Sequence, residues 1–143
     1  MKQNGDGVGD SLKLFFDKLF GTSDYSNKYT EKEREDNNIL AFLAYVIPPL
    51  PFSIERNSKY VVFHSNQAMN NLAWFLIFMI FLKIMSYGFN GNSTVELLKK
   101  ICIFVYAILC FVGVFFVMKN QAKELPIVSK VNLINIVGGL FKK

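Results

Sequence analysis

The sequence predicts an all-α fold: a small multi-pass helical membrane protein with two full spans and a proline-broken or re-entrant segment, preceded by an amphipathic interfacial helix. Hydrophobic residues make up 52% of the 143 residues. Residues 101–118 contain no charge, and residues 61–82 are also uncharged. Eighteen uncharged residues are the threshold for a membrane-spanning helix. Two such runs joined by a short polar loop would fill most of a small soluble domain.

Residues 1–37 are predicted to form a polar leader that contains one helix at 11–20 and then a linker. In SLKLFFDKLF the apolar residues share one helical face, Ser11 can cap the start and Gly21 can end the helix. This helix suits the membrane interface; the alternative is that its face docks on another protein or on the remaining helices. We expect four interfacial anchors in the chain: Phe15, Phe16, Phe20 and Trp74.

The apolar stretch 39–52 is interrupted by Pro48, Pro49 and Pro51. A continuous helix is excluded, because proline removes a backbone donor and clashes with the preceding turn. A helical part followed by extended residues would approach the hydrocarbon thickness of about 30 Å. Extended backbone must, however, be covered by other helices when it lies in lipid. A broken span and a re-entrant hairpin both remain open.

The remainder, 38–143, is predicted to be the helical membrane domain. One helix extends to about Tyr87, the breaker-rich stretch 88–94 (GFNGNST) forms a turn, and a second helix runs from about Val95 to Met118. Glu96 falls in the first turn of that helix, where the helix dipole favours an acid. After Pro126 the apolar residues fall on all sides of a helical wheel, so we expect the C-terminal tail to lie on the surface and to be partly extended.

Charge asymmetry favours two full spans with both termini in the cytoplasm. If 39–52 re-enters, one side of the membrane holds thirteen Lys and Arg: six before residue 39, two in 53–59 and five after residue 118. The opposite side then holds only Lys83, Lys99 and Lys100. If 39–52 spans instead, the division is nine against seven. The positive-inside rule follows such differences.

The sequence offers no catalytic, metal or cofactor site. No acidic residue lies between Glu55 and Glu96, and the single histidine has no Cys or Asp at local spacing to complete a nucleophile and base. Cys102 and Cys110 are eight residues apart in one helix, about 12 Å, so they cannot bridge each other. The net charge of +5 comes from scattered lysines, which favours anionic lipid over nucleic acid as the counter-charge.

The most polar part of the second apolar run is a cluster near its start. This polar stripe consists of His64, Asn66, Gln67, Asn70 and Asn71. On a helical wheel its members fall within about 160°, opposite Val61, Val62, Ala68 and Met69. Three interpretations remain open: amides that bind headgroups or water, an interhelical hydrogen-bond network that also serves carbonyls freed by the prolines, and a hydrated path for a substrate.

Two motifs resemble a known family. KYVVFHSNQAMNN contains F-H-x-N-Q, and AKELPIVSK follows the last span. With the polar linker and the proline-ended segment, these elements resemble small bacterial membrane proteins of unknown function related to the Tic-twenty-like import components of the chloroplast inner envelope. The resemblance covers residues 22–131. It implies a small helical membrane domain and kinship with a translocation component, and it supplies no catalytic residue. Ala68 departs from the glycine often found there, and the tail continues to GGLFKK.

Two functions follow as hypotheses. The first is a non-enzymatic integral protein of the bacterial cytoplasmic membrane that acts as an accessory, scaffold or self-assembling subunit, with the lipid bilayer and a membrane protein or its own copies as partners. The alternative is a transport or translocation component in which the polar stripe lines a hydrated path. A translocation role rests on fold-level analogy.

Overall fold

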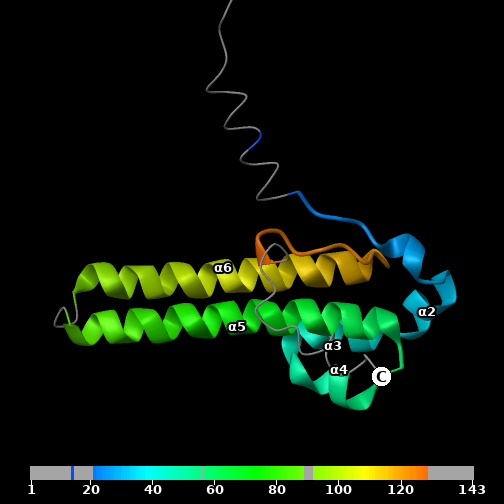
Figure 1. Ribbon diagram of the computed structural model, residues 1–143, viewed down its shortest axis with the longest axis horizontal. Helices are drawn as coiled ribbons and strands as arrows, with labels where there is room; N and C mark the ends of the chain where they lie inside the picture. Colours follow the sequence, from blue (N-terminus) through cyan, green and yellow to red (C-terminus); the bar gives the residue numbers. More distant parts are fainter. Residues whose placement is uncertain (1–13, 15–20, 56, 89–91, 129–143) are drawn as a thin grey trace, which may run out of the picture.

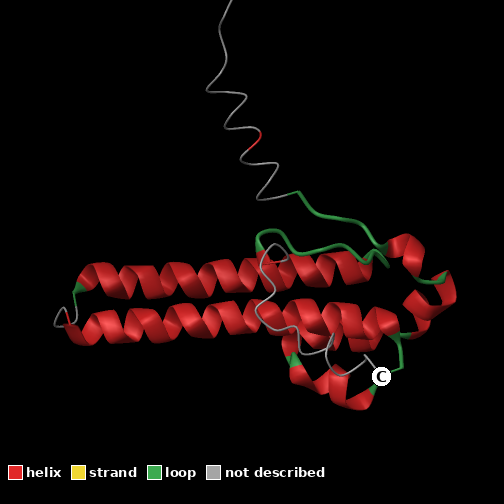
Figure 2. Ribbon diagram, in the orientation of Figure 1, coloured by secondary structure: helices red, strands yellow, loops and turns green. Residues whose placement is uncertain are grey.

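The computed structural model describes residues 14, 21–55, 57–88 and 92–128. Within these residues the chain is helical, with one isolated β-bridge between Asp24 and Lys123. The elements are η1 (Ser26–Lys28), α2 (Glu31–Asp36), α3 (Asn38–Val46), α4 (Pro49–Ile54), α5 (Lys59–Gly88) and α6 (Ser93–Met118). The predicted all-α class is confirmed. Figure 2 shows helices and loops, and no strand, in the described part of the chain.

Helices α5 and α6 form a long antiparallel hairpin (Figure 1). They contain 30 and 26 residues, about 45 and 39 Å at 1.5 Å per residue. Asn71 Nδ2 donates to Cys110 Sγ at 3.5 Å, and the rings of Phe75 and Tyr106 stack at 4.5 Å. Both helices are long and apolar enough to cross a membrane.

A polar side chain caps the start of α6. The side chain of Asn92 accepts a hydrogen bond from the Thr94 amide at 3.1 Å, so α6 begins at Ser93, two residues before the predicted start. An N-terminal Asn satisfies one of the amides that a helix start leaves free. Glu96 lies in the first turn, as predicted, and pairs with Lys99 at 2.6 Å.

The proline-rich segment folds as two short helices rather than as a helix followed by extended chain. Helix α3 ends where Ile47 N donates to Leu43 O at 2.8 Å. Pro48 caps α4 and Pro49 is its first residue. Proline is favourable there because its fixed φ suits a helix start and the first amides have no intrahelical acceptor. Of the arrangements left open, the one with extended residues after the prolines is not found; the prolines start a new helix that packs on α5.

The predicted linker belongs to the folded part. Tyr25 N donates to Ala122 O at 2.8 Å, and Glu124 N donates to Ser23 O at 3.1 Å. Tyr25 also packs edge-on against Phe63 at 5.9 Å. These contacts join the predicted leader, residues 1–37, to the predicted membrane domain, residues 38–143.

The described part of the C-terminal tail, 119–128, corrects the expectation of a surface-lying segment. Ala122 and Leu125 are fully buried, and Val128 is 4% exposed. Helix α6 ends in a Schellman motif, with Asn120 at φ 53° and Gln121 N donating to Phe116 O at 2.9 Å. This turn sends the chain back along the hairpin (Figure 1), where every third residue from Ala122 faces the interior.

The predicted amphipathic helix 11–20, with Phe15, Phe16 and Phe20, lies outside the described residues except for Leu14. Leu14 is helical and exposed.

Polar and apolar side chains are distributed unlike those of a water-soluble domain. The buried polar residues are concentrated in the first half of α5. Large apolar side chains of the second half of α5 and most of α6 are exposed, among them Ile77 at 49%, Phe104 at 66% and Phe111 at 72%. Such a large exposed apolar surface marks contact with lipid or with other proteins.

Candidate functional site

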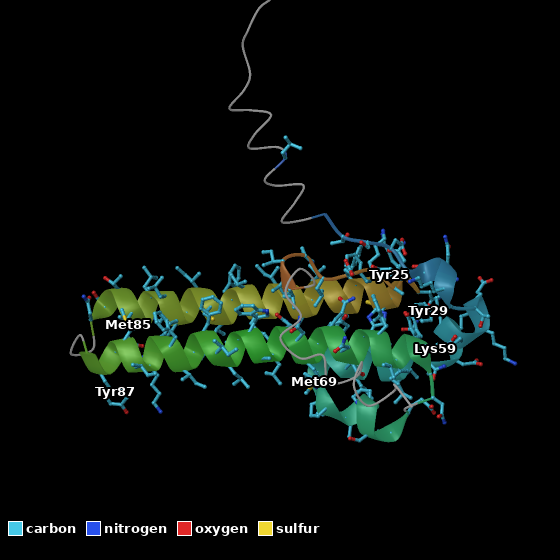
Figure 3. All side chains as sticks on the ribbon, in the orientation of Figure 1. Tyr25, Tyr29, Lys59, Met69, Met85 and Tyr87 are labelled. Atoms are coloured by element: carbon cyan, nitrogen blue, oxygen red, sulfur yellow. The ribbon has the colours of Figure 1, made fainter. Side chains whose placement is uncertain are left out.

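The polar stripe lies at the end of the hairpin where α2, α3, α4 and the tail gather. His64, Gln67, Asn70 and Asn71 are buried, and Asn66 is half-buried. Figure 3 shows this crowded end, with Tyr25, Tyr29 and Lys59, opposite the bare end that carries Met85 and Tyr87. The stripe therefore faces protein.

Gln67 binds the backbone of the tail with both ends of its amide. Its Oε1 accepts from Leu125 N at 2.6 Å, and its Nε2 donates to Lys123 O at 3.2 Å. An extended segment packed against helices has no ladder partner for these groups, and an unpaired buried amide or carbonyl is costly. The Gln67 side chain thus makes the hydrogen bonds that a neighbouring strand would make in a sheet.

Asn70 and Asn71 extend the same network toward the C-terminal end of α5. Asn70 Nδ2 donates to Val128 O at 2.9 Å, whereas Asn71 points to α6 and bonds to Cys110 Sγ. Asn70 and Gln67 hold the tail, and Asn71 links the two long helices. The hydrogen bonds of Gln67, Asn70 and Asn71 seen among the described residues join α5 to the tail and to α6. Whether these amides also serve carbonyls freed by Pro48 and Pro49 stays a prediction.

His64 is enclosed by aromatic rings. Its Nδ1 lies 3.0 Å from the hydroxyl of Tyr45 on α3. The ring of Tyr60 lies 4.7 Å from the imidazole and that of Phe63 lies 5.2 Å away, both edge-on. Edge-to-face packing suits the charge distribution of aromatic rings. Rings on two helices and the Tyr45 hydroxyl therefore fix the orientation of His64.

Four buried polar atoms near this site have no hydrogen-bond partner among the described residues: Arg34 Nε, Tyr60 Oη, His64 Nε2 and Ser65 Oγ. The backbone of Gln121 lies close to the imidazole, without reaching hydrogen-bond geometry to Nε2. Orphaned buried atoms are uncommon in native proteins. The burial of these polar atoms is therefore not offset by hydrogen bonds within the described chain.

The ring of Tyr45 on α3 packs directly against the backbone of Gly113 on α6, beside His64. A Cβ added at Gly113 would lie 2.2 Å from Cε1 of Tyr45. The glycine therefore leaves the space that the tyrosine ring fills, and this contact positions the hydroxyl that meets His64. Tyr45 and Gly113 are site residues that sequence reasoning missed; a glycine inside an apolar helix was the available signal.

The start of α5 is held by carboxylates from other segments. Glu33 Oε1 on α2 accepts from Tyr60 N at 3.3 Å and from Ser58 Oγ at 3.3 Å. Glu55 Oε1 accepts from Asn57 N at 2.9 Å. Carboxylates at a helix N-terminus satisfy its free amides and complement its dipole. Glu33 of the linker thus holds the start of α5, and with it the polar stripe, in position. The composition of the linker did not indicate this role.

A second polar junction closes the end of α6. Arg34 Nη1 donates to Asn120 O at 2.6 Å, and Asn38 Nδ2 donates to Asn120 Oδ1 at 2.6 Å. The turn that reverses the chain into the tail is therefore bound to α2 and α3. Tail, linker and stripe form one connected unit.

The other predicted site residues are placed differently. Pro48 and Pro51 are buried and Pro49 is exposed at the start of α4. Trp74 lies in the middle of α5, roughly 21–22 Å from each end, and packs against the core. The predicted role of Trp74 as an interfacial anchor stays a prediction.

The described residues contain no group of three or more His, Cys, Asp or Glu side chains that could hold a metal ion. His64 has a tyrosine as its side-chain partner. The hydrogen bonds of Gln67, Asn70 and Asn71 join segments of the same chain.

Comparisons with known proteins identify no relative: no family model, no curated protein and no solved structure matches the chain.

Proposed function

We propose that the protein is a non-enzymatic integral protein of the bacterial cytoplasmic membrane, an accessory or self-assembling subunit built on the α5–α6 hairpin. The observation that carries the proposal is the reversed polarity of α5. Its amides are buried against the tail, while its later apolar residues, such as Ile77 and Phe81, are about half exposed. Lipid is the environment in which that arrangement is stable.

The depth of the hairpin follows from the register of its contacts. Asn71 meets Cys110 and Phe75 meets Tyr106. Residues 101–118 of α6 then lie opposite residues 63–80 of α5. This slab is about 27 Å thick, close to the roughly 30 Å hydrocarbon core. It encloses the polar stripe, whose burial within protein is what makes amides tolerable at that depth.

The segment α3–α4 favours the re-entrant alternative. Helix α3 contains nine residues, about 13 Å, which is too short to cross the slab. Helix α4 then returns toward Lys59 at the start of α5. With two full spans, both termini lie on the cytoplasmic side, in agreement with the distribution of lysines.

The alternative, a translocation component with a hydrated path along the stripe, is favoured by the F-H-x-N-Q resemblance and by the orphaned atoms around His64. It requires the tail to leave Gln67 and Asn70, because these amides bond to tail backbone. The hydrogen bonds therefore support the subunit hypothesis more directly.

Two experiments test the proposal. Alkaline extraction of native membranes should leave the protein in the membrane pellet; release into the supernatant would refute an integral assignment. Crosslinking in native membranes should trap a specific partner or a homo-oligomer through the exposed faces of α5 and α6. Recovery of only the monomer would contradict a subunit role.

A further inference from the structure

A groove runs between α5 and α6 near the bare end of the hairpin. It has a volume of about 300 Å³ and is lined by Leu76, Met79, Ile80, Lys83 and Lys99. Its floor is apolar, and Leu76 and Ile80 are 49% and 59% exposed. The volume is at the lower end of ligand pockets, which span roughly 300–1,000 Å³. The shape and lining suit a hydrocarbon chain lying along the helices.

Two lysines give one end of this groove a positive charge. Lys99 Nζ pairs with Glu96 at 2.6 Å. Lys83 is exposed and has no ion pair with any described residue. Glu96 therefore neutralises only one of the two lysines, and the groove keeps a net positive charge that an anionic group would complement.

The depth of the lysines fits a phosphate group. In the proposed slab, Lys99 lies two residues outside residue 101, about 3 Å, and Lys83 lies three residues beyond residue 80, about 4.5 Å. Both ammonium groups therefore fall at the boundary between hydrocarbon and headgroups, while the apolar floor lies on the hydrocarbon side. Lysines at such a boundary reach toward headgroups.

We propose that this groove binds one anionic phospholipid, with its phosphate between Lys83 and Lys99 and an acyl chain along Leu76, Met79 and Ile80. The proposal rests on the membrane assignment above. The partner is lipid and not a peptide, because the groove opens on the apolar surface that the hairpin presents to the bilayer and its polar groups are confined to the headgroup level.

The test uses the full chain reconstituted in vesicles of phosphatidylcholine with and without phosphatidylglycerol. Spin-labelled phosphatidylglycerol reports lipid held at the protein as a motionally restricted component. We expect restriction of phosphatidylglycerol above that of spin-labelled phosphatidylcholine, and Lys83→Gln should weaken the preference about five-fold, the effect of one lysine near the headgroups.

Two further variants separate charge from shape. Lys100→Gln removes an exposed lysine of α6 that does not line the groove, and it should leave the preference unchanged. Ile80→Trp fills the floor without altering charge, and it should reduce restricted lipid of both kinds.

The lipid site would be overturned if the unaltered chain, Lys83→Gln and Lys100→Gln showed the same preference for phosphatidylglycerol. It would also be overturned if Ile80→Trp left the amount of motionally restricted lipid unchanged. Flotation with the vesicles is measured in the same samples. Failure of the unaltered chain to float would remove the membrane assignment and the site together, whereas flotation without lipid preference removes the site alone.

Discussion

The Tyr45 hydroxyl lies 3.0 Å from Nδ1 of His64, and both side chains are buried. This contact joins helix α3 to the polar stripe of α5. Replacing Tyr45 by Phe keeps the ring and leaves a buried imidazole nitrogen without a partner. We expect a loss of about 1–3 kcal/mol in the free energy of unfolding, measured by denaturation in detergent micelles. Tyr87→Phe, at an exposed position, is the control; equal stability of the two variants would contradict the structural role of the contact.

Gly113 allows Tyr45 to reach His64. Gly113→Ala places a Cβ 2.2 Å from the tyrosine ring, so α3 or the ring must shift. We expect a destabilisation of about 1–3 kcal/mol, typical of overpacking, in the same denaturation assay. The double variant Gly113→Ala with Tyr45→Leu should cost less than the sum of the single changes, since the clash disappears with the ring. Strict additivity would show that the two residues do not interact.

Gln67 holds the tail by two hydrogen bonds to its backbone. Gln67→Leu leaves Lys123 O and Leu125 N unpaired, which favours detachment of the tail. We predict faster tryptic cleavage after Lys123 in the intact protein in detergent. Asn66→Leu, at the half-buried member of the stripe, should cleave at the original rate. Equal cleavage rates for the two variants would refute the tail-holding role.

The link between linker and tail should weaken in acid. Hydrogen bonds from Ser26, with the nearby Lys123, lower the pKa of Asp24 below its ordinary 3.8. A lowered folded-state pKa means that the stabilisation is present above about pH 4 and is lost as the pH falls through the folded pKa. Because Asp24 is exposed, the effect is roughly a few tenths of a kcal/mol. Comparing the unfolding free energy of the unaltered chain with Asp24→Asn should reveal a difference at pH 7 that vanishes in acid; a difference independent of pH would contradict it.

The long apolar helices were predictable because their signal is local. The uncharged runs predict two long helices, which the structure contains as α5 and α6. The breaker residues of GFNGNST predict where one helix ends and the next begins. The buried tail was not predictable, because the spacing of Ala122, Leu125 and Val128 also suits one face of a helix, which Pro126 would interrupt. Their burial depends on Gln67 and Asn70, more than fifty residues away in the chain.

The polar stripe also combines a local signal that the sequence carries with long-range packing that it does not. Wheel geometry placed His64, Gln67, Asn70 and Asn71 on one face, and the structure buries all four. What covers that face depends on long-range packing: Tyr45 reaches it only because Gly113 lacks a side chain. For the prolines, local chemistry permitted both an extended chain and a helix start, and the packing of α4 on α3 and α5 selects the second.

The central claim is that the polar stripe is covered by protein and that the later residues of α5 face lipid. It is tested most directly by the accessibility of single cysteines placed along residues 66–81, in a cysteine-free chain reconstituted in vesicles. Each position is treated with a water-soluble thiol reagent and with a lipid-soluble one, and folding of each variant is verified by its unfolding transition. The account predicts that Gln67 and Asn70 positions resist both reagents, whereas Ile77 and Phe81 positions react only with the lipid-soluble reagent. Reaction of every stripe position with the water-soluble reagent, continuing past Trp74, would contradict it and establish a hydrated path.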